Sequence, residues 1–328
     1  MSPFTPVPEA SVAHLGERAL IDTIKTWLGS VNPPSPQGMG DDCAVLPTPE
    51  GKTLLTVDPL IYGRHFDDTL EPELAGAKLL KRNLSDIAAM GGSPQAAILA
   101  LCLSGDVATA WLEHFIDGLK QACIDFSMTI NGGDIAQAPS QHFAATLTLF
   151  GNALRPMTRL GGVAGDTLWV TGELGGSILG HHACFTPRLA EGQWLAAQAE
   201  VKAMMDMTDG LAKDLPAMLA PQTCAQLDTA SLPLAQAASL RAKETGHTPL
   251  YHACCDGEDY ELLFVLDAQA DIETFQQAWQ NAQTTRLSCI GRIDTALKPE
   301  HALRLIDSSN GEVLFPQGGY EHLSNHDG

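Results

Sequence analysis

The chain has 328 residues, which corresponds to two domains at the usual size of roughly 100–200 residues per domain. Apolar residues make up 45% and charged residues 18% of the chain, and this composition excludes disordered, collagen-like and coiled-coil proteins. With 39 acidic against 19 basic residues, the net charge of −20 disfavours binding to nucleic acid or to an anionic membrane. Any anionic ligand would therefore need cations beside it.

The eight cysteines show no CxxC pair and no regular spacing, so they predict neither a zinc site nor a disulfide framework. The N-terminus lacks a basic segment followed by an apolar stretch. The longest apolar run, 96–103, is too short to span a bilayer. We therefore expect a cytoplasmic protein without an export signal or a membrane-spanning segment.

The first half of the chain predicts helices and strands in alternation. Apolar residues at helical spacing predict a helix over 14–29, which ends at Gly29. A β-rich stretch at 53–58 follows the loop 40–43, and Pro72 opens a helix that extends to Arg82. A long amphipathic helix over about 107–126 leads to strands at 128–131 and 143–151.

The second half begins after a stretch rich in Gly, Pro and Arg, which predicts a boundary near residue 153. We expect an N-terminal domain over 1–153 and a C-terminal domain over 154–328. Strands are predicted at 167–172, 260–266 and 288–293, with a helix near 272–283. Both halves thus mix helices and strands.

Aspartates recur beside Gly, Ser or Thr, mostly in predicted loops at the ends of strands or the starts of helices. They are Asp41 and Asp42 in GDD, Asp58, Asp86 in NLSD, Asp134 in GGD, and Asp206 and Asp209 in MDMTDG. Taken singly, each is a good turn or N-cap residue. Taken together, carboxylates that converge from several loops would bind hard cations such as Mg²⁺, which in turn hold phosphates.

Other patterns have plain structural interpretations. The stretch 172–180 is a tight turn between strand and helix whose amides could alternatively hold a phosphate, although no P-loop or GxGxxG motif is present. His181 and His182 are adjacent and would diverge by about 100° on a helix, so we interpret them as ordinary surface or core residues and assign them no role. Cys254 and Cys255 are interpreted as buried thiols.

Seven motifs occur in the order seen in thiamine-monophosphate kinase, and together they cover nearly the whole chain. They are GDDCAV (40–45), DPLIYGRHF (58–66), KLLKRNLSDIAAMGG (78–92), NGGDIA (131–136), GDTLWVTGELGGS (165–177), MDMTDGLAKDL (205–215) and DGEDYELLF (256–264). The chain therefore resembles this family, within the superfamily of aminoimidazole ribonucleotide synthetase. The resemblance implies an α+β fold of two domains, in which the N-terminal mixed sheets pair across a homodimer and a C-terminal α/β domain completes the active site.

The resemblance also implies the site residues. The metal ligands for several Mg²⁺ ions would be Asp42, Thr56, Asp58, Asp86, Asp134, Asp206 and Asp209. ATP would contact Gly133, Asp134, Arg159 and Thr208, with Arg159 and Lys78 as phosphate clamps. The acceptor, thiamine monophosphate, would contact His65, Glu258 and an aromatic residue near the C-terminus, for which Tyr320 is the candidate.

Three departures from the family pattern leave the metal aspartates in place. Ile135 replaces a hydroxyl residue after Asp134, Asp256 replaces a glycine, and Arg64 stands in the DPLIYGRHF motif as either a surface charge or a phosphate contact.

The reaction implied is in-line transfer of the γ-phosphoryl group of ATP to thiamine monophosphate, with no general base and no phospho-enzyme. The alternatives are another ATP-dependent member of the superfamily with a different small acceptor, or a nucleotide-binding paralogue without activity. A binuclear metallohydrolase is disfavoured because the histidines are not spaced with the aspartates.

Overall fold

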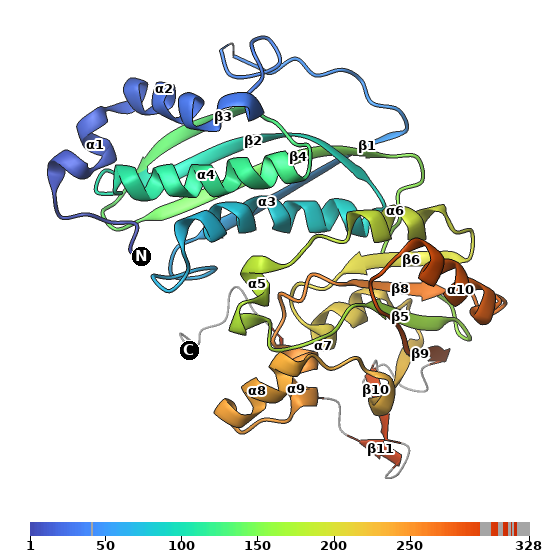
Figure 1. Cartoon of the computed structure of the whole chain (residues 1–328). Coiled ribbons are helices and arrows are strands. Elements are labelled where there is room, and N and C mark those ends of the chain that lie inside the picture. Colours follow the sequence, from blue (N-terminus) through green and yellow to red (C-terminus); the bar gives the residue numbers. More distant parts are fainter. Residues whose placement is uncertain (41, 296–302, 308–310, 314–315, 317, 320–328) are drawn as a thin grey trace. The chain divides into compact units, whose positions relative to one another are not determined.

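The computed structural model describes residues 1–40, 42–295, 303–307, 311–313, 316 and 318–319 (Figure 1). The chain divides into two compact units, and each is described by itself. Unit 1 comprises Met1–Ile87 and Gly92–Leu154, and unit 2 comprises Ala88–Gly91 and the chain from Arg155 onward. No helix in the described part is long and apolar enough to cross a membrane.

Unit 1 contains short helical turns, three longer helices and four strands. In chain order these are η1 (Pro8–Ala10), α1 (Val12–Leu15), α2 (Glu17–Leu28), η2 (Gly29–Val31), β1 (Lys52–Ile61), α3 (Pro72–Ala89), β2 (Ser93–Ser104), α4 (Thr109–Asp125), β3 (Ile130–Ala138) and β4 (Phe143–Ala153). The last two residues of α3, Ala88 and Ala89, belong to unit 2.

The strands of unit 1 form a mixed sheet in the order β1-β4-β2-β3. Strand β4 pairs antiparallel with both β1 and β2, whereas β2 and β3 run parallel. Strand β2, inside the sheet, contains the apolar run 96–103, for which the sequence predicted no strand. Its continuous apolar sequence lacks the alternation that marks a half-buried strand.

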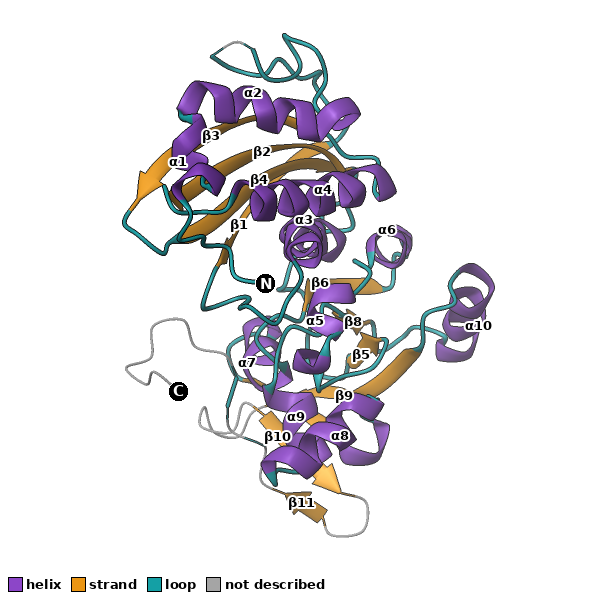
Figure 2. Ribbon diagram, turned by 60° about the vertical axis from the view of Figure 1, so that its left-hand side comes forward, coloured by secondary structure: helices purple, strands orange, loops and turns teal. Residues whose placement is uncertain are grey.

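Helices α3 and α4 lie together on one face of this sheet (Figures 1 and 2). Trp111 of α4 packs edge-on against Phe143 of β4, with ring centroids 4.8 Å apart. The opposite face remains more open: Leu55 and Val57 on β1 are 64% and 57% exposed. Since side chains alternate along a strand, Thr56 and Asp58 of the same strand point toward the helices.

Unit 2 contains the remaining elements. These are β5 (Thr167–Thr171), η3 (Ser177–Leu179), α5 (His181–Cys184), α6 (Leu189–Ala197), β6 (Val201–Asp206), α7 (Leu211–Asp214), η4 (Leu215–Met218), β7 (Thr223–Asp228), η5 (Thr229–Ser231), α8 (Gln236–Thr245), α9 (Pro249–Cys255), β8 (Leu262–Leu266), α10 (Ile272–Ala282), β9 (Leu287–Thr295), β10 (Leu303–Asp307) and β11 (Gly311–Val313).

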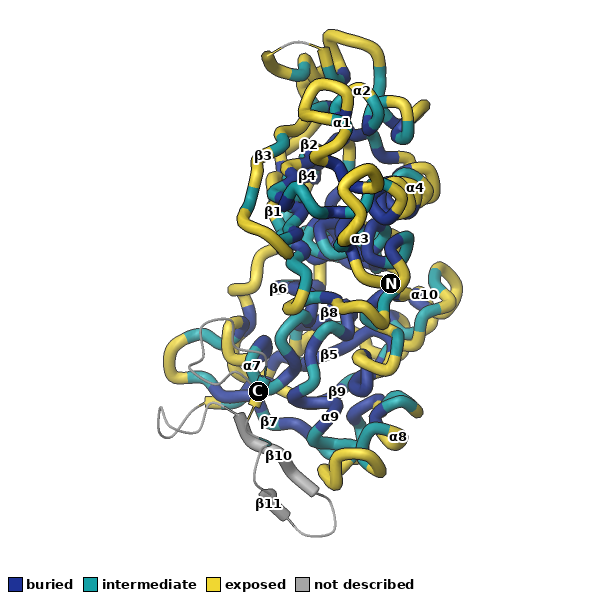
Figure 3. The backbone as a smooth tube through the Cα atoms, turned by 90° about the vertical axis from the view of Figure 1, so that its left-hand side faces the viewer, coloured by how far each residue is buried: buried dark blue, intermediate teal, exposed yellow. Residues whose placement is uncertain are grey.

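The described strands of unit 2 form one sheet in the order β11-β10-β7-β9-β5-β8-β6. Both of its faces are covered. Leu263 and Val265 of β8 join a core with α7 and α9, whereas Phe264 joins a second core with α6 and α10. All five side chains of β8 are buried for this reason (Figure 3).

The α+β class is confirmed, and three element boundaries need correction. The helix predicted to stop at Arg82 continues to Ala89, so Asp86 is helical and not in a loop. The strand expected over 128–131 begins at Ile130 and continues through Asp134 to Ala138. The strand expected from residue 260 begins at Leu262, because the backbone of Tyr260 has a left-handed φ of 51°.

Candidate functional site

The first group of predicted residues lies between β1 and α3 in unit 1. The hydroxyl of Thr56 donates a hydrogen bond to Oδ2 of Asp86. One turn earlier on α3, the guanidinium of Arg82 lies 3.8 Å from Oδ1 of Asp58 and donates to the carbonyl of Pro59 at 2.8 Å. The oxygens of Thr56, Asp58 and Asp86 are hard donors of the kind that Mg²⁺ prefers.

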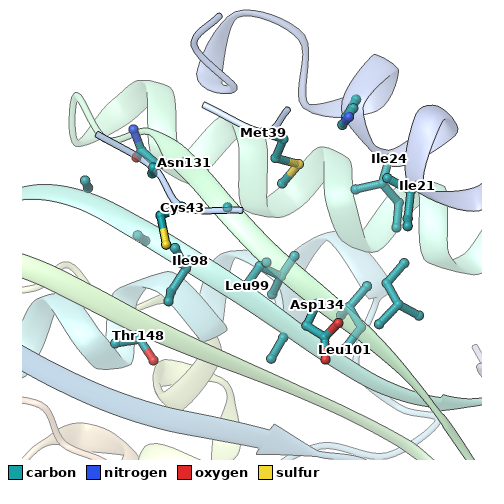
Figure 4. A pocket seen from close by; sticks show the side chains of 18 of the residues that line it. Ile21, Ile24, Met39, Cys43, Ile98, Leu99, Leu101, Asn131, Asp134 and Thr148 are labelled. Atoms are coloured by element: carbon teal, nitrogen blue, oxygen red, sulfur yellow. The ribbon is translucent and has the colours of Figure 1, made fainter. Parts of the chain in front are cut away.

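The second group lines a cavity of about 800 Å³ in unit 1. Asp42 reaches it from the loop after Gly40, while Gly133 and Asp134 reach it from β3. Its other walls are largely apolar and include Ile21 and Ile24 of α2, as Figure 4 shows. The cavity thus combines an apolar lining with two exposed carboxylates.

The glycine at 133 is required by the sheet itself. A Cβ atom at this position would lie 2.0 Å from the carbonyl oxygen of Leu99 on the neighbouring strand β2. The next residues, Asp134 and Ile135, both line the cavity. Ile135, the first departure from the family pattern, therefore adds to its apolar wall.

His65 lies in a tight turn after β1. Its Nδ1 atom accepts a hydrogen bond from the amide of Ile61 at 2.9 Å, which orients the ring. Lys78 is fully buried, and its ammonium group donates to the carbonyl of His65 at 3.0 Å. The structure thus places Lys78 behind the turn that carries His65. Arg64, in the same turn, is exposed.

In unit 2, the turn after β6 carries two predicted residues, Thr208 and Asp209, and is held by a carboxylate that sequence reasoning missed. Buried Asp214 accepts the amides of Thr208 and Asp209 at 2.9 Å and 3.0 Å. Burial raises the pKa of Asp214 to about 6. The two amide hydrogen bonds and the positive charge of Arg159 lower this pKa, but by less.

A second segment, Gly257–Glu261, runs alongside this turn. The amide of Glu258 donates to the carbonyl of Thr208 at 2.8 Å, and the amide of Tyr260 donates to the carbonyl of Met207 at 2.9 Å. These bonds continue the pairing of β6 with β8 beyond the ends of both strands. Thr208, predicted to contact ATP, and Glu258, predicted to contact the acceptor, are therefore fixed side by side.

The side chain of Glu258 has two neighbours that the sequence did not single out for a role. The hydroxyl of Tyr260 donates to Oε1 of Glu258 at 3.1 Å, and Nδ1 of His182 lies 3.6 Å from Oε2. The sequence signal for Tyr260 was its place in the long GEDYELLF motif, two residues after Glu258. A tyrosine at that spacing can reach the carboxylate of the glutamate.

The glycine-rich turn at 172–177 binds carboxylates in place of a phosphate. The amide of Gly175 donates to Oδ1 of Asp259 at 2.9 Å, and the amide of Gly176 donates to Oδ2 of Asp256 at 3.1 Å. Asp256, another departure from the family pattern, also bonds Nδ1 of His252 at 2.7 Å. Burial raises the pKa of Asp259 well above its ordinary value. The turn is thus a structural clamp on the segment that carries Glu258.

The predicted metal ligands are distributed over both units, and each unit is described by itself. No group of three or more His, Cys, Asp or Glu side chains in that part of the chain lies close enough to hold a metal ion. In unit 1, Thr56 contacts Asp86, and Asp42 and Asp134 line one cavity; in unit 2, Asp206 at the end of β6 and Asp209 in the following turn are near in sequence. Asp209 also pairs with Lys213 at 3.0 Å. Tyr320 lies outside the described residues.

Comparisons with known proteins agree on one family. Residues 40–153 match the family model described as AIR synthase related protein, N-terminal domain. The chain is 34% identical over 292 residues to a thiamine-monophosphate kinase of Rhodopirellula baltica, covering 86% of this chain and 90% of the relative. It is 36% identical over 254 residues to the thiamine-monophosphate kinase of Escherichia coli K12, covering 70% and 76%.

Solved structures point the same way. The crystal structure of thiamine monophosphate kinase from Aquifex aeolicus superposes with a TM-score of 0.67 at 26% identity, covering 90% of this chain and 97% of that chain. A structure described as AaThiL complexed with AMPPCP and TMP gives a TM-score of 0.71 at 27% identity, with coverages of 95% and 98%. A hydrogenase maturation protein HypE in complex with ATP shares the fold, with a TM-score of 0.74 at 16% identity.

Proposed function

The chain belongs to the thiamine-monophosphate kinase family, and from this membership we propose that it transfers the γ-phosphoryl group of ATP directly to thiamine monophosphate. The products are thiamine diphosphate and ADP. The transfer is in line, and Mg²⁺ ions held by the aspartates of the chain assist it.

The observation that carries this proposal is the hydrogen-bonded pairing of the turn 206–210 with the segment 257–261. It fixes the proposed ATP contact Thr208 beside the proposed acceptor contact Glu258, through the amide of Glu258 and the carbonyl of Thr208 at 2.8 Å. Holding two reactants in a fixed relative position is a large part of the catalysis of phosphoryl transfer.

The metal ligands are proposed from both units. Unit 1 supplies Asp42, Thr56, Asp58, Asp86 and Asp134, and unit 2 supplies Asp206 and Asp209. Their oxygens are hard donors without thiolate or imidazole among them, which fits Mg²⁺. These carboxylates would hold Mg²⁺, which would supply the positive charge that a polyanionic donor and an anionic acceptor need in order to approach. Thr56 and Asp86 already hold their oxygens in contact.

The nucleotide is proposed to use the cavity of unit 1. Its apolar walls suit a purine base, and Gly133 and Asp134 stand where phosphates with their metal ions would follow. In unit 2, Arg159 is proposed to clamp a phosphate and Thr208 to donate its hydroxyl. Buried Asp214 keeps the amides of Thr208 and Asp209 oriented for this task.

The acceptor is proposed to contact His65, Glu258 and Tyr320. The acceptor needs no general base from the protein, because a phosphate monoester has a second pKa of about 6 and is largely dianionic at pH 7. Thiamine also carries a cationic ring and an amino group, which the carboxylate of Glu258 can bind. The histidine at 65 orients the acceptor without taking its proton.

The protein is proposed to work as a homodimer in the cytoplasm. The open face of the unit 1 sheet exposes Leu55 and Val57 on β1. Clustered apolar side chains on a sheet face mark a surface that another protein covers. Pairing this face with the same face of a second copy would give a closed, symmetric interface.

An endpoint assay tests the reaction. The purified protein is incubated with ATP, Mg²⁺ and thiamine monophosphate, with free thiamine as a parallel acceptor, and the products are separated by chromatography. Equal amounts of thiamine diphosphate and ADP that depend on Mg²⁺ are expected. ADP without thiamine diphosphate would show that the acceptor is a different molecule. The absence of ADP would contradict the proposed kinase and favour the alternative of a nucleotide-binding paralogue without activity.

A further inference from the structure

The segment that carries Glu258 has an unusual backbone. Glu258 and Tyr260 adopt φ angles of 54° and 51°, in the left-handed region that residues with a Cβ atom rarely occupy. Such residues persist only where their surroundings fix them. Such strain gathers at functional sites, so the contacts that fix this segment bear on what it binds.

Both carboxylate oxygens of Glu258 have a neighbour. The hydroxyl of Tyr260 donates to Oε1 at 3.1 Å, and Nδ1 of His182 lies 3.6 Å from Oε2. The His182 side chain is 12% exposed and that of Glu258 is 27% exposed. The contact is therefore largely removed from bulk water, where a pairing of this kind is worth more than on an open surface.

The neighbours are themselves held in place. Phe185, which follows α5, stacks on Tyr260 with ring centroids 3.9 Å apart and an interplanar angle of 12°. Nε2 of His181 lies 3.2 Å from the carbonyl oxygen of Asp259. Short helix α5 thus packs along the segment on both sides of His182. A side chain on such a support can hold Glu258 in one orientation.

We propose that His182 is a positioning residue for the acceptor, which acts by orienting the carboxylate of Glu258. The inference rests on the proposed function, because it assigns Glu258 to an acceptor that carries a cationic or amino-bearing ring. A carboxylate ordered in advance loses less conformational freedom when the ligand binds. His182 therefore contributes to acceptor affinity and leaves the nucleotide and the transfer step unaffected.

The test compares His182→Ala, His182→Asn and, as a control, His247→Ala, which removes an exposed histidine stacked on Tyr251 in the same unit. For each protein, kcat and the KM for each substrate are measured, together with the affinity for thiamine monophosphate alone by calorimetry. His182→Ala is expected to weaken acceptor binding about three- to tenfold, which is about 0.7–1.4 kcal/mol. The KM for ATP and kcat are expected to stay within twofold of wild type.

The conservative variant separates positioning from general packing. His182→Asn retains an N–H donor near the position of Nδ1 and is expected to recover most of the affinity that alanine loses. Unchanged acceptor affinity in His182→Ala, or equal losses with both substrates, would overturn the inference. If the wild-type protein forms no thiamine diphosphate, the proposed function fails first and the role of His182 with it. If the wild type forms thiamine diphosphate but His182→Ala binds the acceptor as the wild type does, only the role proposed for His182 is overturned.

Discussion

At the scale of single residues, buried Asp214 makes a prediction about pH. Its pKa of about 6 in the folded protein exceeds the ordinary value of 3.8. Between these values the folded state holds a proton that the unfolded state releases, so this group stabilises the fold below pH 4 and the contribution is lost as pH rises through 6. The difference amounts to about 3 kcal/mol at 1.36 kcal/mol per unit.

The measurement is urea unfolding of the metal-free wild type and Asp214→Asn at pH 4 and pH 7. Asparagine does not titrate, so the difference in unfolding free energy between the two proteins isolates this carboxyl. We expect the wild type to gain about 2 kcal/mol relative to the variant on going from pH 7 to pH 4, because at pH 4 the unfolded carboxyl is still partly ionised. An equal difference at both pH values would show that Asp214 does not bind its proton in this range.

A second prediction at this scale concerns the metal ligands of unit 1. Asp86→Asn and Asp58→Asn remove charge without removing volume, so we expect turnover to fall by at least ~100-fold while the fold persists. The control is Asp117→Asn, an exposed aspartate on α4. Rates at saturating Mg²⁺ and thermal melting curves give the result. Near-normal activity in either ligand variant would remove that aspartate from the metal site.

At the scale of elements, the bond between Asp256 and the glycine-rich turn predicts a loss of stability. Asp256→Ala leaves Nδ1 of His252 and the amide of Gly176 without their partner, and His252 is buried. We expect a loss of about 1–3 kcal/mol in unfolding free energy, because unsatisfied buried donors carry that cost. The control Glu244→Ala removes an exposed residue of α8 and should change stability by less than about 0.5 kcal/mol. Equal stability of both variants would contradict the clamp.

Elements with a clear period could be predicted from the sequence, and elements that lack one could not. The amphipathic helix at 109–125 was anticipated nearly in full because Leu112, Phe115 and Leu119 repeat at helical spacing. Strand β2 was missed because it is apolar on both sides. The end of α3 was missed because Asn83, Ser85 and Asp86 resemble a loop when read locally. Tertiary contacts, such as the hydrogen bond from Thr56 to Asp86, stabilise the helical conformation of these residues.

The candidate site shows the same division. Aspartates beside glycines are visible in any reading of the sequence, and motif order pointed to the family. Asp214 and His182 were not found because their roles arise from contacts across the fold: one orients the amides of a turn, and the other lies beside a carboxylate 76 positions away, at Glu258. Such contacts cannot be predicted from the spacing of residues along the sequence.

At the scale of the whole molecule, the open face of the unit 1 sheet predicts the oligomeric state. We expect the wild type to be a dimer in light scattering coupled to gel filtration. The double variant Leu55→Glu, Val57→Glu should be monomeric, because charges on this face oppose its burial. The control Leu154→Glu changes a leucine that is 81% exposed and lies just beyond the end of β4, outside the paired strands, and should remain dimeric. A dimeric double variant would place the interface elsewhere.

The hydrogen bonds between Met207–Thr208 and Glu258–Tyr260 have a consequence for how such an enzyme can change. Because the proposed donor and acceptor contacts share one backbone ladder, a substitution that shifts one of them also shifts the other. A change in this backbone would therefore alter the selectivity for ATP and the selectivity for the acceptor together. A new acceptor would have to be accommodated through side chains that surround the ladder, such as those of α5, while the ladder itself stays as it is.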